Sequence, residues 1–164
     1  MKTLSSEQAL PGQNGDRLET RALSRSDLSR VLDIERQGYS HPWTEAIFLD
    51  CFKDNYRLWA LMCGEDLIGY AVVAYLVDEA HLLNLCVHPD SRGYGAGRYL
   101  LEHLVDRSRH DGMVQVLLEV RVTNRAAEQL YLSAGFGEIG RRPGYYPASH
   151  GREDARVMTL ALDK

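Results

Sequence analysis

A glycine-rich turn between an apolar strand and an amphipathic helix constrains the fold of this chain more than any other feature. It reads Arg92-Gly93-Tyr94-Gly95-Ala96-Gly97 and follows the apolar stretch 80–87. Glycines let the backbone adopt positive φ angles and approach a ligand closely. The helix that follows offers free N–H groups and the positive end of its dipole. The segment therefore predicts a phosphate cradle, to which Arg92 and Arg98 can add positive charge.

Two familiar phosphate motifs do not fit this turn. A P-loop ends in Gly-Lys-Ser or Gly-Lys-Thr, which is missing here, and the dinucleotide fingerprint GxGxxG has its third glycine one residue later. A purely structural turn is the alternative interpretation, because glycine also serves wherever a tight turn needs it.

Hydrophobic spacing predicts the other elements. Helices are expected from Leu28 up to Gly38, from Trp43 or Thr44 through Cys51, over Gly97–Arg109 and over Asn124–Ala134. Strands are expected over Arg57–Cys63, Leu67–Tyr75, Ala80–Val87, Met113–Val120, Phe136–Arg141 and Arg156–Leu162, with a loop at Pro143–Pro147. Early hairpins and a late strand–helix–strand crossover predict the α/β class, with a mixed sheet of the α+β type. The central mixed β-sheet would have helices on both faces.

Length and composition limit the class of protein. The chain has 164 residues, enough for one domain over 21–164 behind a polar, poorly ordered tail over 1–20. With 19 basic and 23 acidic residues the formal net charge is −4, which argues against a general nucleic-acid binder. The longest apolar run without charge, Leu67–Val77, is too short for a membrane-spanning helix, and the N-terminus has no signal-peptide core. We therefore expect a cytoplasmic protein that has no membrane partner.

Cysteine and histidine spacing predicts no metal site. The three cysteines form no CxxC pair, and the six histidines show no ligand spacing such as HExxH. Each cysteine is therefore interpreted as a small buried apolar residue with a reduced thiol.

The turn and four other segments carry a resemblance to a known family. The pattern Arg-x-x-Gly-x-Gly at the start of an amphipathic helix resembles the acetyl-CoA pyrophosphate loop of the GNAT acyltransferases. Four further segments resemble the bacterial ribosomal-protein-alanine N-acetyltransferases within that superfamily: His41-Pro42-Trp43, Leu118–Asn124 (LEVRVTN), Ala127–Phe136 (AEQLYLSAGF), and Gly144–Pro147 with Gly151–Ala155. The resemblance implies the GNAT acyl-CoA N-acyltransferase fold, whose central strands splay apart, and acetyl-CoA as co-substrate without a metal.

The resemblance also implies which residues bind acetyl-CoA. The backbone of Leu85, Cys86 and Val87 would bind the pantetheine arm as a neighbouring strand would be bound. The pyrophosphate would lie on the turn, at Arg92, Gly93, Tyr94, Gly95, Ala96, Gly97 and Arg98. Asn124 would cap its helix and also hydrogen-bond the pantetheine, although a cap alone explains this residue equally well.

Glu119 and Tyr131 are the candidates for the chemistry of acyl transfer. Glu119 lies on a strand between apolar residues, on the opposite face, and the family places the general base here. Its alternative is a solvated or ion-paired carboxylate, with Arg121 or another neighbour. Tyr131, with an ordinary pKa of about 10, can donate a proton to the leaving thiolate; its alternative is a core aromatic. A covalent route through Cys86 is disfavoured, because no histidine has an obvious position to activate the thiol.

The remaining candidates concern the acceptor. Trp43, Tyr145 and Tyr146 are expected to form the walls of a peptide slot, or else a rigid loop packed on the core. The resemblance favours transfer of an acetyl group to the α-amine of an N-terminal alanine by direct attack in a ternary complex. The protein partner would be a basic, small-subunit ribosomal protein, without direct contact to nucleic acid. Acetylation of lysine side chains or a small amine is the first alternative, and a catalytically silent CoA-binding module is the second.

Overall fold

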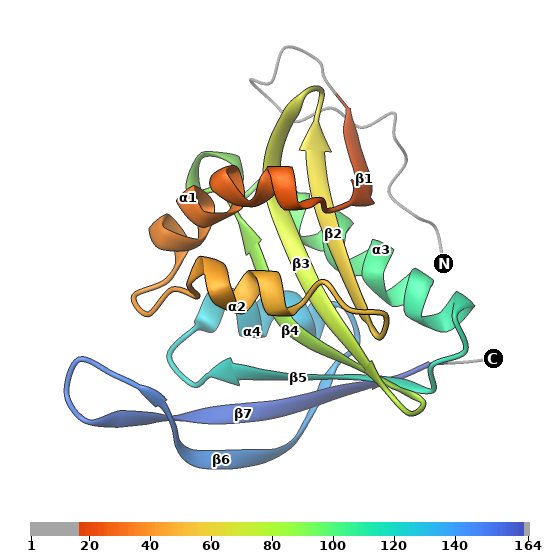
Figure 1. The fold of residues 1–164 in the computed structure, drawn as a ribbon. Helices are drawn as coiled ribbons and strands as arrows, with labels where there is room; N and C mark the ends of the chain where they lie inside the picture. Colours follow the sequence, from red (N-terminus) through yellow and green to blue (C-terminus); the bar gives the residue numbers. More distant parts are fainter. Residues whose placement is uncertain (1–16, 163–164) are drawn as a thin grey trace.

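A seven-stranded mixed β-sheet organises the part of the chain that the computed structural model describes, residues 17–162 (Figure 1). Its strands are β1 (Leu18–Ala22), β2 (Tyr56–Cys63), β3 (Asp66–Leu76), β4 (Glu79–Val87), β5 (Gln115–Arg121), β6 (Gly137–Pro147) and β7 (Arg152–Ala161). Their order across the sheet is β1-β2-β3-β4-β5-β7-β6. Only β4 and β5 pair in parallel, and all the other neighbours are antiparallel. The mixed sheet expected from the sequence is confirmed.

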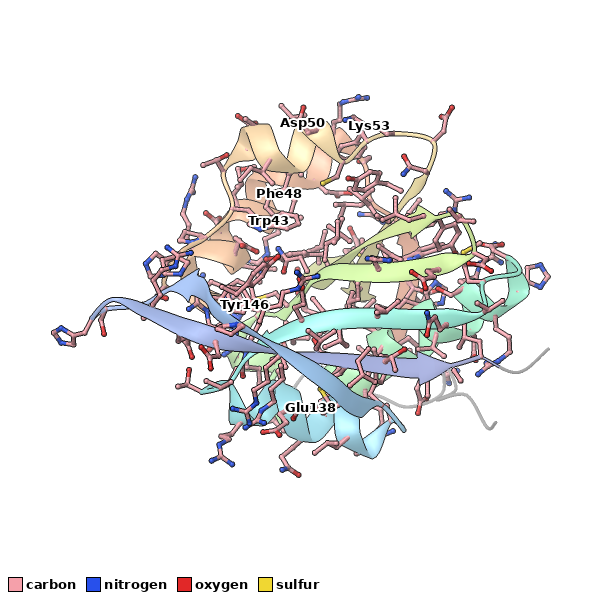
Figure 2. All side chains as sticks on the ribbon, turned by 90° about the horizontal axis from the view of Figure 1, so that it is seen from below. Trp43, Phe48, Asp50, Lys53, Glu138 and Tyr146 are labelled. Atoms are coloured by element: carbon pink, nitrogen blue, oxygen red, sulfur yellow. The ribbon has the colours of Figure 1, made fainter. Side chains whose placement is uncertain are left out.

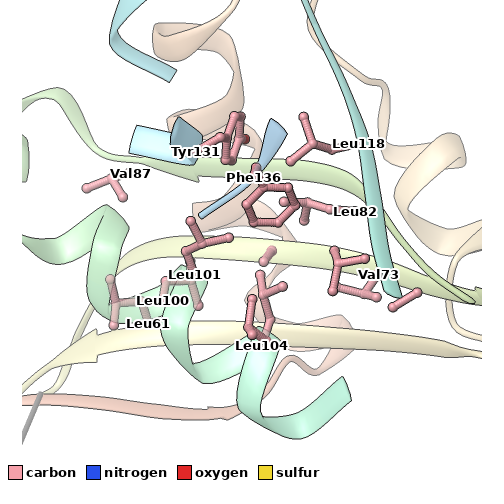
Figure 3. Packing of buried hydrophobic residues seen from close by; sticks show 14 of the residues in the cluster. Leu61, Val73, Leu82, Val87, Leu100, Leu101, Leu104, Leu118, Tyr131 and Phe136 are labelled. Atoms are coloured by element: carbon pink, nitrogen blue, oxygen red, sulfur yellow. The ribbon is translucent and has the colours of Figure 1, made fainter. Parts of the chain in front are cut away.

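Helices cover both faces of the sheet, which is also as expected (Figure 1). The α-helices are α1 (Leu28–Gly38), α2 (Glu45–Asp50), α3 (Ala96–His110) and α4 (Arg125–Ser133). Apolar side chains of α1 and α2, among them Val31, Ile34 and Phe48, are buried against Tyr70 and Val72 of β3. On the other face, Leu100, Leu101 and Leu104 of α3 pack with Leu61, Val73, Leu82, Tyr131 and Phe136 (Figure 3). Since alternate residues of β3 point to opposite faces, one strand serves both cores.

The two parallel strands separate after four residue pairs. β4 and β5 are in register only from Glu79 with Gln115 to Leu82 with Leu118. Beyond that point β4 stays paired with β3 up to Val87, while β5 stays paired with β7 up to Arg121. Each strand is therefore held by its outer neighbour, and the sheet opens between them. This is the splay that the GNAT fold implies.

The edges of the sheet differ from what the sequence led us to expect. Leu18 is buried in the core under α3, so residues 18–20, assigned to the tail, belong to β1. The strand reads Leu-Glu-Thr-Arg-Ala and is too polar to give a strand signal. The predicted tail over 1–16 lies outside the described residues.

The predicted loop at Pro143–Pro147 is wrong, because this segment lies within β6. The pairing with β7 is interrupted between Arg142 and Tyr146, where Gly144 has φ 58°. Proline and glycine are tolerated there because β6 is an edge strand, whose outer side needs no hydrogen-bonding partner.

Among residues 17–162, no helix is both long and apolar enough to cross a membrane.

Gly69 gives a test of how tightly β3 and β4 are packed. A Cβ atom at Gly69 would lie 2.9 Å from the carbonyl oxygen of Cys86, which is backbone and cannot rotate away. Gly69→Ala should therefore lower the free energy of unfolding by about 1–3 kcal/mol. Gly140→Ala in β6 is the matched control, because no heavy atom lies within 4 Å of its added Cβ. Denaturant unfolding that gave equal stabilities for the two variants would contradict this packing.

Candidate active site

The opening between β4 and β5 contains a cavity with a volume of about 600 Å³. Most residues that the sequence singled out line it: Trp43, Leu85, Cys86, Val87, Arg92, Gly93, Gly95, Gly97, Arg98, Glu119, Asn124, Tyr131 and Tyr146. Three of the predicted site residues are not among those that line it, namely Tyr94, Ala96 and Tyr145. The cavity thus gathers side chains from α1, β4, the glycine turn, β5, α4 and β6 into one place.

The glycine-rich turn has the backbone geometry of an anion site. Gly93 and Gly95 have φ angles of 84° and 85°, and a Cβ atom at either would meet nothing within 4 Å. Gly95 is the N-cap of α3, and the helix begins its hydrogen-bonding with Tyr99 N–H to the Gly95 carbonyl oxygen at 2.9 Å. The N–H groups of the first turn therefore have no partner within the helix. Tyr94 is half exposed, whereas Ala96, the first residue of α3, is buried in the core.

Both arginines of the turn are held by protein groups. The Arg92 Nε–H donates to the Val87 carbonyl oxygen at 2.9 Å, which ties the turn to the end of β4. Arg98 forms an ion pair with Glu102 at 3.4 Å and donates a hydrogen bond to Ser133 Oγ. Both still line the cavity, so their positive charge lies beside the glycine-rich turn.

The end of β4 offers the unpaired edge expected for a pantetheine arm. Leu85, Cys86 and Val87 all lie beyond the last pair between β4 and β5. The Tyr39 hydroxyl donates to the Leu85 carbonyl oxygen at 2.7 Å and steadies this segment from the end of α1.

The Cys86 thiol is packed on the side of α1. A Cβ atom on Gly38 would lie 2.6 Å from its Sγ atom. Burial raises the pKa of the Cys86 thiol above its ordinary value, which disfavours the nucleophilic thiolate. These contacts suit a structural thiol better than a covalent route.

Glu119 lies on the face of β5 opposite the apolar core. Its neighbours Leu118 and Val120 are buried under α3, so alternation places Glu119 on the side of α1. Its carboxylate is ion-paired with Arg142 of β6. Burial, with the nearby Glu119 carboxylate as a further cause, raises the pKa of the Tyr145 hydroxyl. The ion-paired alternative is thus observed in the structure, but with Arg142. Arg121 instead pairs with Glu153 at 2.9 Å.

Tyr131 enters the cavity from α4. It is 7% exposed and packs against Phe136, with ring centroids 5.7 Å apart. Burial raises the pKa of the Tyr131 hydroxyl well above its ordinary value, and nearby Tyr146 and Cys86 add to the effect. The phenol therefore keeps its proton at neutral pH, as a proton donor must. Asn124 caps the same helix, its Oδ1 atom accepting from Ala127 N–H at 3.2 Å.

Two of the three aromatic residues expected to contact the acceptor, Trp43 and Tyr146, line the cavity. Figure 2 shows Trp43 on the side of α1 and α2, and Tyr146 on β6. The Trp43 ring packs edge-on against Phe48, with centroids 5.1 Å apart. Tyr146 stacks under the Arg121 guanidinium at 4.5 Å, and burial raises the pKa of its hydroxyl to about 12. Tyr145 lies outside this cavity lining and contacts the edge of the Tyr146 ring.

Four residues of the site were missed by the sequence analysis: Glu35, Tyr39, Asn84 and Arg142. Only Glu35 gave a signal, because its spacing of four from Val31 places a charged residue on the apolar stripe of α1. The other three depend on contacts between distant segments. Among residues 17–162, no group of three histidine, cysteine, aspartate or glutamate side chains is placed to hold a metal ion.

Comparisons with known proteins place this architecture in a family. The model of the acetyltransferase (GNAT) family matches residues 25–136. A ribosomal protein bS18-alanine N-acetyltransferase from Salmonella typhimurium is 39% identical over 140 residues, which cover 85% of this chain and 95% of that protein.

Solved structures agree with that match. The crystal structure of the Escherichia coli ribosomal-protein-S18-alanine N-acetyltransferase has a TM-score of 0.85 and 37% identity, with 90% of this chain and 95% of that chain covered. A Salmonella typhimurium structure that contains acetyl-CoA as its cofactor shares the fold at a TM-score of 0.76 and 20% identity, with 90% and 95% covered. The chain belongs to the GNAT family of acetyltransferases.

Proposed function

We propose that this protein transfers the acetyl group of acetyl-CoA to the α-amine of an N-terminal alanine on a small-subunit ribosomal protein. One observation carries the proposal: a single cavity in the β4–β5 opening brings together an anion-binding turn, a general base candidate, a proton donor and an aromatic slot. The names of the Salmonella and Escherichia coli relatives support the same acceptor.

The cavity has a suitable place for each part of acetyl-CoA. The first turn of α3 and the positive-φ glycines suit the pyrophosphate. The unpaired edge of β4 from Leu85 to Val87 suits the amide-rich pantetheine arm, which can hydrogen-bond there as a strand does. Asn124 lies on the opposite wall and lines the same cavity. The thioester would then lie between Glu119 and Tyr131.

This arrangement has one residue to accept the proton of the amine and another to protonate the leaving thiolate. Glu119, directly or through water, takes a proton from the acceptor amine as its nitrogen attacks the thioester carbon. The new C–N bond forms, the C–S bond breaks, and Tyr131 gives its proton to the departing sulfur. The two residues reach the cavity from different walls, β5 and α4, so that the acyl group can lie between them.

An N-terminal acceptor suits these groups better than lysine does. An α-amine has a pKa of about 7.7–8.0, against about 10.4 for a lysine side chain, so a larger fraction is neutral near pH 7. The aromatic walls at Trp43 and Tyr146 can clamp a short extended segment. Acetylation of lysine or of a small amine has no specific observation in its favour.

Replacing Glu119 separates an enzyme from a silent module. Glu119→Gln should lower kcat by about 100- to 10,000-fold, the usual contribution of a general base, because an amide cannot take the amine proton. The dissociation constant of acetyl-CoA should stay within about twofold, because binding rests on other residues. Glu138→Gln, an acidic residue of β6 paired with Arg156 and Arg141, is the matched control. A CoA-binding module without catalysis would show no turnover in the unchanged protein. Full turnover in Glu119→Gln would exclude Glu119 as the general base.

The raised pKa of Tyr131 predicts the shape of the pH profile. A raised pKa means that the phenol holds its proton to higher pH, so the proton donor is not lost on the alkaline side. The value of kcat/KM should rise as the α-amine loses its proton at about pH 8 and then stay level to about pH 10. A fall below about pH 10 that disappears in Tyr131→Phe would show that the phenol ionises there, against this account.

A further inference from the structure

Glu35 is a charged residue that the proposed chemistry does not use, yet it lies at the wall of the cavity. It belongs to α1 and is 1% exposed. Three donors converge on its carboxylate: the Tyr70 hydroxyl at 2.5 Å, Asn84 Nδ2 at 2.9 Å and the backbone N–H of Trp43 at 2.9 Å. One buried side chain therefore links β3, β4 and the aromatic wall of the acceptor slot.

This contact determines which way the Asn84 amide faces. The Glu35 carboxylate is the acceptor for all three donors, so the NH₂ group of Asn84 must face it. The oxygen of the same amide, Oδ1, is buried and has no hydrogen-bonding partner among residues 17–162. An unsatisfied buried carbonyl is costly and calls for a donor. Asn84 is more than nine-tenths buried and lines the cavity, so the missing donor has to come from a molecule that binds in the cavity and packs against this side chain.

Asn84 and Glu119 lie on the same face of the opening between β4 and β5. Leu82 and Leu118 form the last pair before the strands separate. Asn84 follows Leu82 by two residues, and Glu119 follows Leu118 by one. Asn84 is paired with Val72, whose side chain packs in the core under α1, so Asn84 faces the side of α1 as well. Glu119 faces the same side and lines the same cavity. An amine bound in this cavity beside Glu119 can therefore also contact Asn84.

We propose that Asn84 Oδ1 accepts one N–H of the acceptor amine, and that Glu35 is a positioning residue that keeps Oδ1 available for it. This inference rests on the proposed function, in which a primary α-amine enters the cavity. A neutral primary amine has two N–H groups and one lone pair. With one N–H on Asn84 and the other directed to Glu119, the lone pair is left to face the thioester carbon. A secondary amine has a single N–H and cannot satisfy both residues.

The test compares two peptides that differ only at the N-terminal nitrogen: one begins with alanine and the other with N-methylalanine. The measured quantity is the ratio of their kcat/KM values. The unchanged enzyme should prefer alanine strongly. Asn84→Leu keeps a side chain of similar size without an acceptor, and should reduce the ratio at least about tenfold. Glu35→Gln, which allows the Asn84 amide to turn over, should reduce the ratio in the same direction.

Tyr70→Phe is the matched control, because it removes a different donor from Glu35 and leaves the contact between Glu35 and Asn84 in place. It should lower the melting temperature without changing the ratio. Melting curves and acetyl-CoA titrations show that each variant is folded. An unchanged ratio in active Asn84→Leu or Glu35→Gln would overturn the inference alone. Failure of the unchanged enzyme to acetylate the alanine peptide would overturn the proposed function, and this inference with it.

Discussion

The early end of pairing between β4 and β5 is the constraint on which the site depends. Four pairs join the strands, and after Leu82 and Leu118 each follows its other neighbour. Backbone groups that would otherwise bond within the sheet then become available, and exposed strand edges bind extended ligands readily. The opening also leaves room for side chains from both faces, so that Tyr131 of α4 and Glu35 of α1 line one cavity.

Buried and partly buried hydrogen bonds hold this opening in shape from the side of α1. Tyr39 fixes the Leu85 carbonyl, and Glu35 fixes Asn84 and the Trp43 backbone. At the far end of β4, Arg92 joins the glycine turn to Val87. Buried polar contacts of this kind are costly to break, because each broken one leaves an unsatisfied group away from water. Most of these polar side chains therefore hold the backbone around the cavity in place.

Sequence patterns predicted the parts of the site that depend on local structure. The glycines of the turn were expected to take positive φ, and Gly93 and Gly95 do. Strand alternation placed Glu119 opposite the apolar core, and the predicted helix from Asn124 carries Tyr131 to the cavity.

The parts that sequence patterns could not predict depend on contacts across the fold. The ion pair of Glu119 with Arg142 joins segments that only the β5–β7–β6 arrangement brings near each other. The amide orientation of Asn84 depends on a carboxylate 49 positions away in the chain. The extent of β6 was missed because proline and glycine are typical of loops, yet an edge strand accommodates them.

Acetyl transfer to short peptides, measured by mass spectrometry, tests the central claim most directly. One peptide would begin with a free alanine and continue with basic residues. A second would have the same sequence with a blocked N-terminus and a free lysine, and others would begin with serine, glycine or methionine. The account predicts one acetyl group on the α-nitrogen of the alanine peptide and none on the blocked peptide. Modification of the lysine in the blocked peptide, or no transfer to any peptide while acetyl-CoA still binds, would contradict it.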